Sequence, residues 1–380
     1  MASERTESPG TLVNRRALLR TTAVAAAGAG ACSPTRLSPQ DFRRGSRAIR
    51  SPSAPYRIDL HAHFLPPDYR AALLSHGHLT IGGYPTPQWS PEATLDFMGR
   101  YGIAAQVLSV SDPGVDFLPP AEAIEMARYC NTYAADLFRT HRERFGGLAV
   151  LPMHDVGAAL AEVEHALDHL RLDGVVLLSA YNGAYLGDPR FEPLMRALDA
   201  RSAYVFVHPA AIPDDAKPSL PLPDFLEEFT FDTTRAASLL IAGGTLARYP
   251  NIRFQLAHAG GTVPFLAYRL GIVSRTPIGE KWPDAVPRPS ALDVSRHIRG
   301  FFYDTALSPA PSAMRSVLAV TELDHIVFGS DWPFSALALS GSGDPQPELS
   351  ETFDVSARIR IERDNSLREL PRLASVVAPL

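Results

Sequence analysis

Five side chains of metal-binding type occur in short motifs spread along the chain. Two histidines stand two residues apart in Asp-Leu-His61-Ala-His63, and single histidines end apolar runs at His208 and His258. Asp331 follows a further apolar run, in the motif Gly-Ser-Asp-Trp-Pro. Three neutral imidazoles and one carboxylate, with a position left for water or substrate, suit a catalytic divalent cation of the zinc or manganese kind. The residue types therefore indicate metal-dependent enzyme chemistry.

The strands and helices that must position these motifs alternate regularly along the chain. Short apolar, β-branched runs alternate with longer helical patterns, which is the signal for βαβ units and a parallel sheet. Eight such units after residue 55 predict an α/β fold of the (β/α)8 TIM-barrel type. A doubly wound open sheet is the alternative, but no glycine-rich nucleotide-binding motif follows the first run. The predicted strands are Arg57–His61, Ile103–Ser109, Phe145–Leu151, Gly174–Leu178, Tyr204–His208, Ile252–His258, Phe301–Asp304 and His325–Ser330, and the predicted helices are 92–101, 120–141, 156–171, 190–201, 233–248, 262–274, 309–321 and 350–362.

The five candidate ligands all lie where predicted strands end, which is where barrel enzymes build their active sites. The two-residue period of a strand puts His61 and His63 on one face, toward the barrel axis. Taken singly, each residue has a simpler interpretation, such as a hydrogen-bonded histidine or a helix-capping aspartate. Their coincidence at four strand ends favours one metal site. The similarly spaced His76-Gly77-His78 follows no predicted strand and indicates a loop, whereas His154 follows the third strand and is a candidate pocket residue.

Composition excludes several classes of protein. A hydrophobic content of 46% with 20% charged residues allows a sizeable buried core, so global disorder is excluded. Thirty-six basic and 41 acidic residues give a net charge of −5, so nucleic acid is not an expected partner. Cys32 and Cys130 stand in no metal-binding or redox spacing, so any metal must rest on histidine and carboxylate.

The first 54 residues have the pattern of a targeting sequence and a linker. The pair Arg15-Arg16 precedes a small-residue apolar run that ends in Ala29-Gly30-Ala31, so residues 1–32 resemble a twin-arginine-type signal peptide. This predicts export to the periplasm or cell surface, with a disordered tail on a cytoplasmic protein as the alternative. Cys32, directly after the run, is a candidate lipid anchor. Residues 33–54, rich in Pro, Ser and Arg, predict a linker, and residues 55–380 form the barrel.

From about Tyr56 to Leu373 the chain resembles the amidohydrolase superfamily, in the branch that contains aminocarboxymuconate semialdehyde decarboxylase and γ-resorcylate decarboxylase. Within that branch the segment Gly82–Glu92 is similar to salicylate and 6-methylsalicylate decarboxylases, with further support from Leu108–Gly114 and Phe231–Ala236. The motifs that carry the superfamily resemblance are Asp59-Leu60-His61-Ala62-His63, His208-Pro209, His258-Ala259-Gly260-Gly261 and Gly329-Ser330-Asp331-Trp332-Pro333-Phe334.

The resemblance implies a role for each matching residue. His258 takes the catalytic position beside the substrate, and Arg269 matches an arginine that reaches a substrate carboxylate across a dimer interface, which implies a homodimer. Two positions depart from relatives: Gly261 stands where the γ-resorcylate type has Glu, and Ala62 where salicylate-like members often have His. One divalent metal ion, Zn²⁺ with Mn²⁺ as the alternative, is implied, held by His61, His63, His208 and Asp331.

The activity implied is non-oxidative, metal-dependent decarboxylation of an o-hydroxybenzoate-type aromatic acid, a small-molecule substrate similar to salicylate or 6-methylsalicylate. We expect Asp331, transiently protonated, to protonate the ring while His258 orients the carboxylate or a metal-bound water. Since the same ligands serve hydrolysis of an amide, lactone or C–C bond, a hydrolase is the alternative, and an exported binding protein with a structural metal is a third possibility. From their positions in the sequence, the rings expected to surround the substrate are Trp89 and Trp332, with Phe64, Pro85 and Tyr181.

Overall fold

The computed structural model describes residues 55–213, 216–273, 288–339 and 341–377. The predicted signal peptide, residues 1–32, and the predicted linker, residues 33–54, lie outside these ranges. Within them, eight strands form one parallel sheet in the order β1, β4, β5, β6, β9, β10, β11, β12. Their bounds are β1 Arg57–His63, β4 Ile103–Ser109, β5 Phe145–Ala149, β6 Gly174–Leu178, β9 Tyr204–His208, β10 Arg253–Leu256, β11 Phe302–Asp304 and β12 Ile326–Val327.

The sheet closes between its first strand and the segment that follows its last. The amide of Leu60 donates to the carbonyl of Phe328 at 2.9 Å, and the amide of Asp331 donates to the carbonyl of His61 at 2.7 Å. The amide of His63 donates to the carbonyl of Trp332, also at 2.7 Å. The predicted (β/α)8 barrel is confirmed, and its closure brings the first and last metal-binding motifs side by side.

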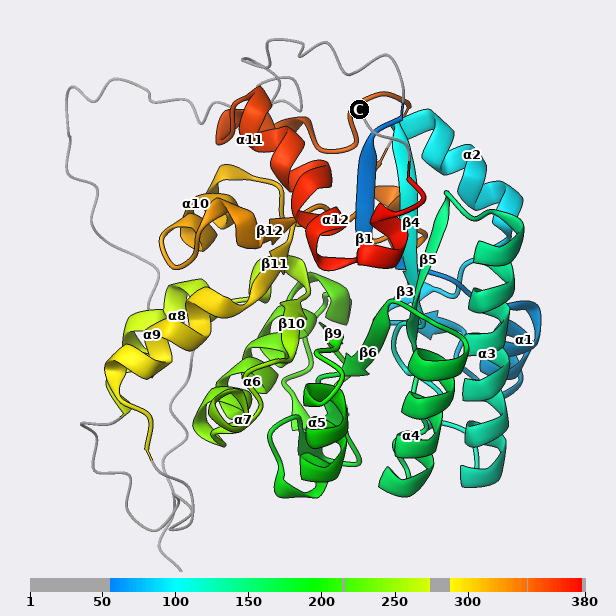
Figure 1. Cartoon of the computed structure of the whole chain (residues 1–380), viewed down its shortest axis with the longest axis horizontal. Helices are drawn as coiled ribbons and strands as arrows, with labels where there is room; N and C mark the ends of the chain where they lie inside the picture. Colours follow the sequence, from blue (N-terminus) through cyan, green and yellow to red (C-terminus); the bar gives the residue numbers. More distant parts are fainter. Residues whose placement is uncertain (1–54, 214–215, 274–287, 340, 378–380) are drawn as a thin grey trace, which may run out of the picture. The chain divides into compact units, whose positions relative to one another are not determined.

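Helices surround the strands, as Figure 1 shows for α2, α3, α4, α5 and α6. Two short hairpins interrupt the alternation, β2 Thr80–Ile81 with β3 Tyr84–Pro85, and β7 Ala180–Tyr181 with β8 Ala184–Tyr185. The α-helices are α1 Pro67–Ser75, α2 Pro91–Tyr101, α3 Pro120–Thr140, α4 Val156–Val163, α5 Glu192–Asp199, α6 Glu228–Ala242, α7 Thr245–Arg248, α8 Val263–Gly271, α9 Ala291–Gly300, α10 Pro311–Leu318, α11 Val355–Ile359, α12 Asn365–Glu369 and α13 Pro371–Ala374.

Local signals explain where individual helices begin and end. The Ser90 side chain accepts from the amide of Ala93 at the start of α2, and Gly102 ends that helix in the left-handed conformation. A reciprocal capping box between Ser290 and Asp293 starts α9, a helix that the hydrophobic pattern did not predict. The hairpins and α1 were likewise not predicted, because short elements carry too few residues for a period to emerge.

Four strands are shorter than predicted, and two of them end within four residues of a predicted site residue. The predicted strands over 252–258 and 325–330 shorten to β10 and β12, and those over 145–151 and 301–304 to β5 and β11. His258 has a φ of 55° and Asp331 a φ of 60°, and a residue with left-handed φ cannot continue an extended strand. The chain therefore turns at the two positions where the sequence placed chemistry.

A buried charge cluster fixes the start of β1 to the C-terminal helices. The Arg57 Nε lies 3.2 Å from Glu362 Oε1, and both side chains are almost fully buried. Arg358, also buried, pairs with Glu362 and with Asp344. Tyr56 donates its hydroxyl to Glu362 as well. Because these groups neutralise one another, charged residues can stand in the interior at this point of the barrel.

Among the helices of the described ranges, none has both the length and the apolar character that a membrane crossing requires.

Candidate metal centre and adjoining pocket

Four side chains predicted as ligands converge at the C-terminal end of the barrel. His61 and His63 come from β1, His208 from the last residue of β9, and Asp331 from the turn after β12. One ligand atom from each of the four lies within 4.8 Å of the others, and all four residues are buried. The fold thus brings together residues separated by up to 270 positions in the sequence.

The distances match those that a small divalent cation demands. The Nε2 atoms of His61 and His63 are 3.1 Å apart, and Asp331 Oδ1 lies 3.3 Å and 3.2 Å from them. Ligand atoms about 2.0 Å from a tetrahedral zinc ion lie about 3.3 Å from one another. Three of the four side chains therefore already stand near the spacing of a coordination shell, and a ligand atom of His208 lies within 4.8 Å of them.

Each histidine is oriented through its other ring nitrogen. The Nδ1 atom lies 2.9 Å from Asp304 Oδ2 in His61, 3.0 Å from Ser109 Oγ in His63 and 2.8 Å from its neighbour's carbonyl in His208. Ser109 Oγ in turn can donate to the carbonyl of Ala62 at 3.2 Å, which leaves it free to accept from His63. Partners of this kind fix the tautomer so that Nε2 carries the lone pair, and they raise ligand basicity. The residues therefore fit a metal ion.

The electrostatics of the centre agree with that fit. Burial lowers the pKa of His63 and holds the pKa of His208 well below its usual range, so both are neutral ligands at neutral pH. Burial also lowers the pKa of His61, but the charges of Asp304 and Asp331 outweigh it and raise that pKa to about 10. For Asp331, burial would raise the pKa, yet the surrounding histidines, His61 first, hold it well below the usual range. The centre therefore favours a positive charge between ionised carboxylates.

Asp59 links the β1 segment that carries His61 and His63 to the segment after β12 that carries Asp331. Its carboxylate accepts the amide of His61 at 3.2 Å, the amide of Ser330 at 2.9 Å and the side chain of Gln106 at 2.8 Å. Burial is the main reason that its pKa rises to about 6. The sequence did not single out Asp59 for this role, although it shares the two-residue period with His61 and His63, and that period is the signal that could have identified it.

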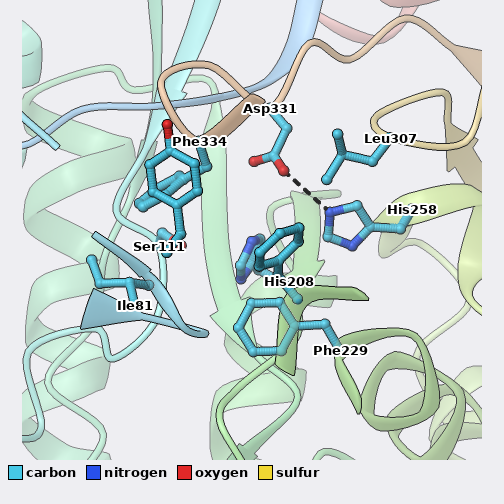
Figure 2. A pocket seen from close by; sticks show the side chains of 10 residues that line it. Ile81, Ser111, His208, Phe229, His258, Leu307, Asp331 and Phe334 are labelled. Carbon is cyan, nitrogen blue, oxygen red and sulfur yellow. Dashed lines mark ion pairs between the residues drawn. The ribbon is translucent and has the colours of Figure 1, made fainter. Parts of the chain in front are cut away.

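His258 stands beside the four ligands and forms a long ion pair with one of them. Its Nε2 lies 3.5 Å from Asp331 Oδ2 (Figure 2), whereas His61 and His63 approach the other oxygen, Oδ1. Both ring nitrogens are buried and make no hydrogen bond to any described residue. A buried imidazole that makes no hydrogen bond is costly unless a bound molecule supplies one, so His258 is placed to meet a substrate.

A small pocket, with about 20 Å³ of enclosed space, lies beside this centre and is lined by His208, His258 and Asp331. Besides His208, His258 and Asp331, its walls are mostly apolar, with only Ser111 and the Tyr84 phenol adding hydroxyls. Figure 2 shows Phe229 close to His208, and Ile81 on the opposite side from His258. No Lys or Arg is among the described residues that line it, and the apolar wall residues are Ile81, Phe225, Phe229, Leu307 and Phe334.

The residues predicted to surround the substrate lie elsewhere. The Trp332 ring stacks on Phe97 at 4.2 Å between centroids, and Trp89 packs edge-to-face against Phe64 and Tyr133. None of Trp89, Trp332, Phe64, Pro85 and Tyr181 is among the pocket-lining residues. A role for Trp89 and Trp332 in substrate binding stays a prediction that the pocket lining does not support.

Three further sequence predictions are placed by the structure. Arg269 is exposed on α8 and is not among the residues that line the pocket. The His154 ring bonds to the carbonyl of Leu118 and is likewise absent from the pocket lining. His76 and His78 follow α1 and pack against Phe117, in agreement with the loop that their context predicted. The histidines that serve the centre are therefore those at strand ends.

Fold and centre together define a class, the metal-dependent enzymes built on a (β/α)8 barrel. A family model described as Amidohydrolase matches residues 58–372, and the chain belongs to this family.

Among curated relatives, the chain is 32% identical to "Decarboxylase yanB" of Aspergillus niger over 335 residues, with 83% of this chain and 88% of that protein covered. It is 35% identical to 6-methylsalicylic acid decarboxylase acuB of Aspergillus aculeatus, covering 73% of this chain and 84% of that protein. Its fold matches a dihydroxybenzoic acid decarboxylase from Polaromonas sp. JS666, crystallised with bound manganese and 2-nitroresorcinol, at a TM-score of 0.67 and 20% identity, covering 83% of this chain and 97% of that one.

Proposed function

We propose that this protein is a metal-dependent carboxy-lyase that removes CO₂ from an o-hydroxybenzoate-type aromatic acid. The observation that carries the proposal is a buried three-histidine, one-aspartate centre, two members of which, His208 and Asp331, line a mostly apolar pocket. The names of the relatives support the same reaction, since both curated relatives described above are decarboxylases.

The divalent ion, when bound, would act as a Lewis acid and template for the phenol oxygen and carboxylate of the substrate. The chain's own groups then manage the proton that must reach the carbon bearing the carboxylate. Asp331 and His258 both line the pocket, with His258 Nε2 3.5 Å from Asp331 Oδ2, so we assign ring protonation to Asp331 and orientation of the substrate carboxylate to His258. Protonation at that carbon interrupts the aromatic ring, and loss of CO₂ restores it, so no organic cofactor is required.

The pocket walls support a substrate with a single carboxylate and apolar ring substituents. With no Lys or Arg among the described lining residues, a second carboxylate would be buried without a partner, which costs several kcal/mol. A methyl group on the ring would instead gain about 0.8 kcal/mol from burial, roughly a fourfold preference. We therefore propose 6-alkylsalicylates as better substrates than salicylate or dicarboxylated rings.

We propose zinc as the resident ion, with manganese as the alternative. A ligand set of three imidazoles and one carboxylate suits zinc, whereas manganese prefers oxygen-rich, octahedral surroundings. Support for manganese comes from the structural relative that was crystallised with it.

The experiment is metal analysis of the purified protein combined with a mass-spectrometric screen of hydroxybenzoates. About one zinc or manganese per chain and a phenol lacking the carboxylate are expected, with 6-methylsalicylate preferred over salicylate. Bound metal without loss of CO₂, but with hydrolysis of amides or lactones, would refute the carboxy-lyase assignment.

We further propose that the protein is a homodimer that uses the face formed by α8. Phe265 and Tyr268 on this helix are 81% and 83% exposed, which is uncommon for aromatic side chains that face only water. Arg269 lies beside them, as a residue that reaches a neighbouring subunit must. Light scattering should give twice the chain mass, and Phe265→Ser with Tyr268→Ser should give the monomer.

Export is proposed from the twin-arginine-type signal alone. Replacing Arg15-Arg16 by two lysines should retain the protein in the cytoplasm of the host, which cell fractionation measures. Cys32→Ser should release a membrane-associated form into the soluble exported fraction if Cys32 carries a lipid, and leave the distribution unchanged if it does not.

A further inference from the structure

Asp304 connects two parts of the site that lie far apart in the sequence. It is the last residue of β11, is fully buried, and uses both carboxylate oxygens twice. Its Oδ2 lies 2.9 Å from Nδ1 of the candidate ligand His61 and accepts from Gln255 Nε2 at 2.8 Å. Its Oδ1 accepts the amides of His258 at 2.9 Å and Ala306 at 3.1 Å. One carboxylate therefore contacts both the ring of the metal ligand His61 and the backbone amide of the pocket residue His258.

The bond to His258 acts where the backbone is strained. A φ of 55° costs a residue with a side chain about 1–2 kcal/mol, and Ala259, the next residue, has a φ of 56°. The hydrogen bond from the His258 amide to Asp304 compensates part of this cost, and it fixes the turn that aims the imidazole at the pocket. Without that acceptor, the chain after β10 would lose the contact that holds His258 in this unusual conformation.

The bond to His61 acts on the metal centre. Since Asp304 accepts the hydrogen bond from Nδ1–H of His61, the Nε2 lone pair of His61 points toward His63 and Asp331. The neighbouring backbone is shaped to admit this pair, because a Cβ on Gly329 would lie 2.6 Å from the Cβ of His61 and 3.3 Å from that of Asp304. The pairing of His61 with Asp304 thus depends on β1, on β11 and on the segment that follows β12.

We propose that Asp304 is a positioning residue that sets the metal ligand His61 and the proton-handling His258 together, so that metal affinity and turnover depend on one carboxylate. A residue with a purely structural role at the end of β11 would affect stability alone. This inference rests on the proposed metal site and goes beyond it, because neither the ligand set nor the reaction requires the two functions to share a support.

The first test uses Asp304→Asn, which keeps the shape of the side chain and replaces one oxygen by a donor. An amide accepts hydrogen bonds only at its oxygen, whereas Asp304 accepts from two donors at each of its two oxygens. The amide nitrogen introduced by Asp304→Asn would therefore face two donors, and either the His61 or the His258 contact is lost. We expect zinc affinity, measured by competition with a chromogenic chelator, or kcat at saturating zinc to fall at least tenfold. Asp304→Ala removes both contacts, and both quantities should fall together.

Glu162→Gln is the matched control. Glu162 is also a buried carboxylate, but it accepts from Arg128 and Asn131 on the helical layer, away from the metal centre. This variant should lower the melting temperature while leaving zinc affinity and kcat within threefold of the parent. It therefore shows what a merely structural loss of a buried carboxylate looks like.

The proposal is overturned if Asp304→Asn melts earlier, as the control does, but keeps both zinc affinity and kcat within threefold. If Asp304→Ala does not fold, Asp304→Asn alone decides the test, because this variant must still lose at least tenfold in zinc affinity or in kcat. Zinc titration needs no substrate, so failure of the decarboxylase assignment would leave the metal readout of Asp304 intact, and the two failures are distinguishable.

Discussion

The hairpin of β2 and β3 forms one wall of the pocket, and its turn makes a contact that only glycine permits. Gly82 has a φ of 55°, and a Cβ built on it would lie 2.5 Å from Cζ of Phe229, a pocket-lining side chain. The amide of Phe225 donates to the carbonyl of Gly82 at 3.1 Å, so the hairpin cannot retreat freely. Gly82→Ala must therefore displace Phe229, break this bond, or both.

The expected magnitude has two parts. A side chain in the left-handed region costs about 1–2 kcal/mol, which lowers the melting temperature by a few degrees. Relief of the overlap requires a movement of about 1 Å, since non-bonded carbons prefer about 3.5–4.0 Å. Phe229 packs edge-to-face on His208, so this movement reaches the metal centre. A misplacement of this size in an active site costs up to about a hundredfold in rate, and we expect kcat/KM to fall at least tenfold.

Gly77→Ala provides the control, because Gly77 has a φ of 85° but no atom within 4 Å of its built Cβ. It incurs the same conformational cost without touching the pocket. Decarboxylation assays and thermal unfolding of both variants should show similar losses of stability, with the loss of kcat/KM confined to Gly82→Ala. The reasoning is refuted if the two variants have kcat/KM values within threefold of each other. Adding Phe229→Leu to Gly82→Ala should restore part of the activity.

Three other outcomes are expected. Asp331→Asn removes the anionic ligand, so elemental analysis should find well below one metal per chain and CO₂ release should vanish; full metal content with retained turnover would contradict both roles. Glu362→Gln leaves Arg57 buried beside a neutral amide, and urea denaturation should show a loss of about 3–5 kcal/mol in the free energy of unfolding, whereas a loss below about 1 kcal/mol would count against the cluster. Burial raises the pKa of Asp112 to about 6, so the folded state binds this proton more tightly than the unfolded state, and stability should fall as pH rises from about 4 to about 6. Asp112→Asn should flatten that decline in thermal unfolding measured across the same range, and an unchanged slope would rule Asp112 out as its source.

The sequence predicts a site residue best where both the residue type and the repeat of its strand or helix are known. The alternation of apolar runs and helical patterns predicted eight strands, and His61 and His63 shared a face because a strand repeats every two residues. His208 and Asp331 were found because barrel chemistry occurs at the C-terminal ends of strands. None of these inferences needed knowledge of which strands become neighbours.

The pocket wall was not predictable in the same way. Trp332 is adjacent to Asp331 in sequence, yet its ring stacks on Phe97, because the left-handed φ at Asp331 redirects the chain. Several side chains that line the pocket in its place come from short segments, such as Phe225 in a single 3-10 turn and Leu307 in the loop after β11. Such segments have no period, and their direction depends on what they pack against.

The sequence by itself determined the barrel and the set of candidate ligands, because both follow from periodicity and from residue type. Only the tertiary structure decided which groups orient those ligands, since Asp304 reaches His61 across 243 positions and Ser109 reaches His63 across 46. It also decided that the ring nitrogens of His258 make no hydrogen bond to the described residues, and that no Lys or Arg is among the described residues that line the pocket. Contacts between distant residues arise from chain closure and side-chain packing, and neither leaves a repeating signal in the sequence.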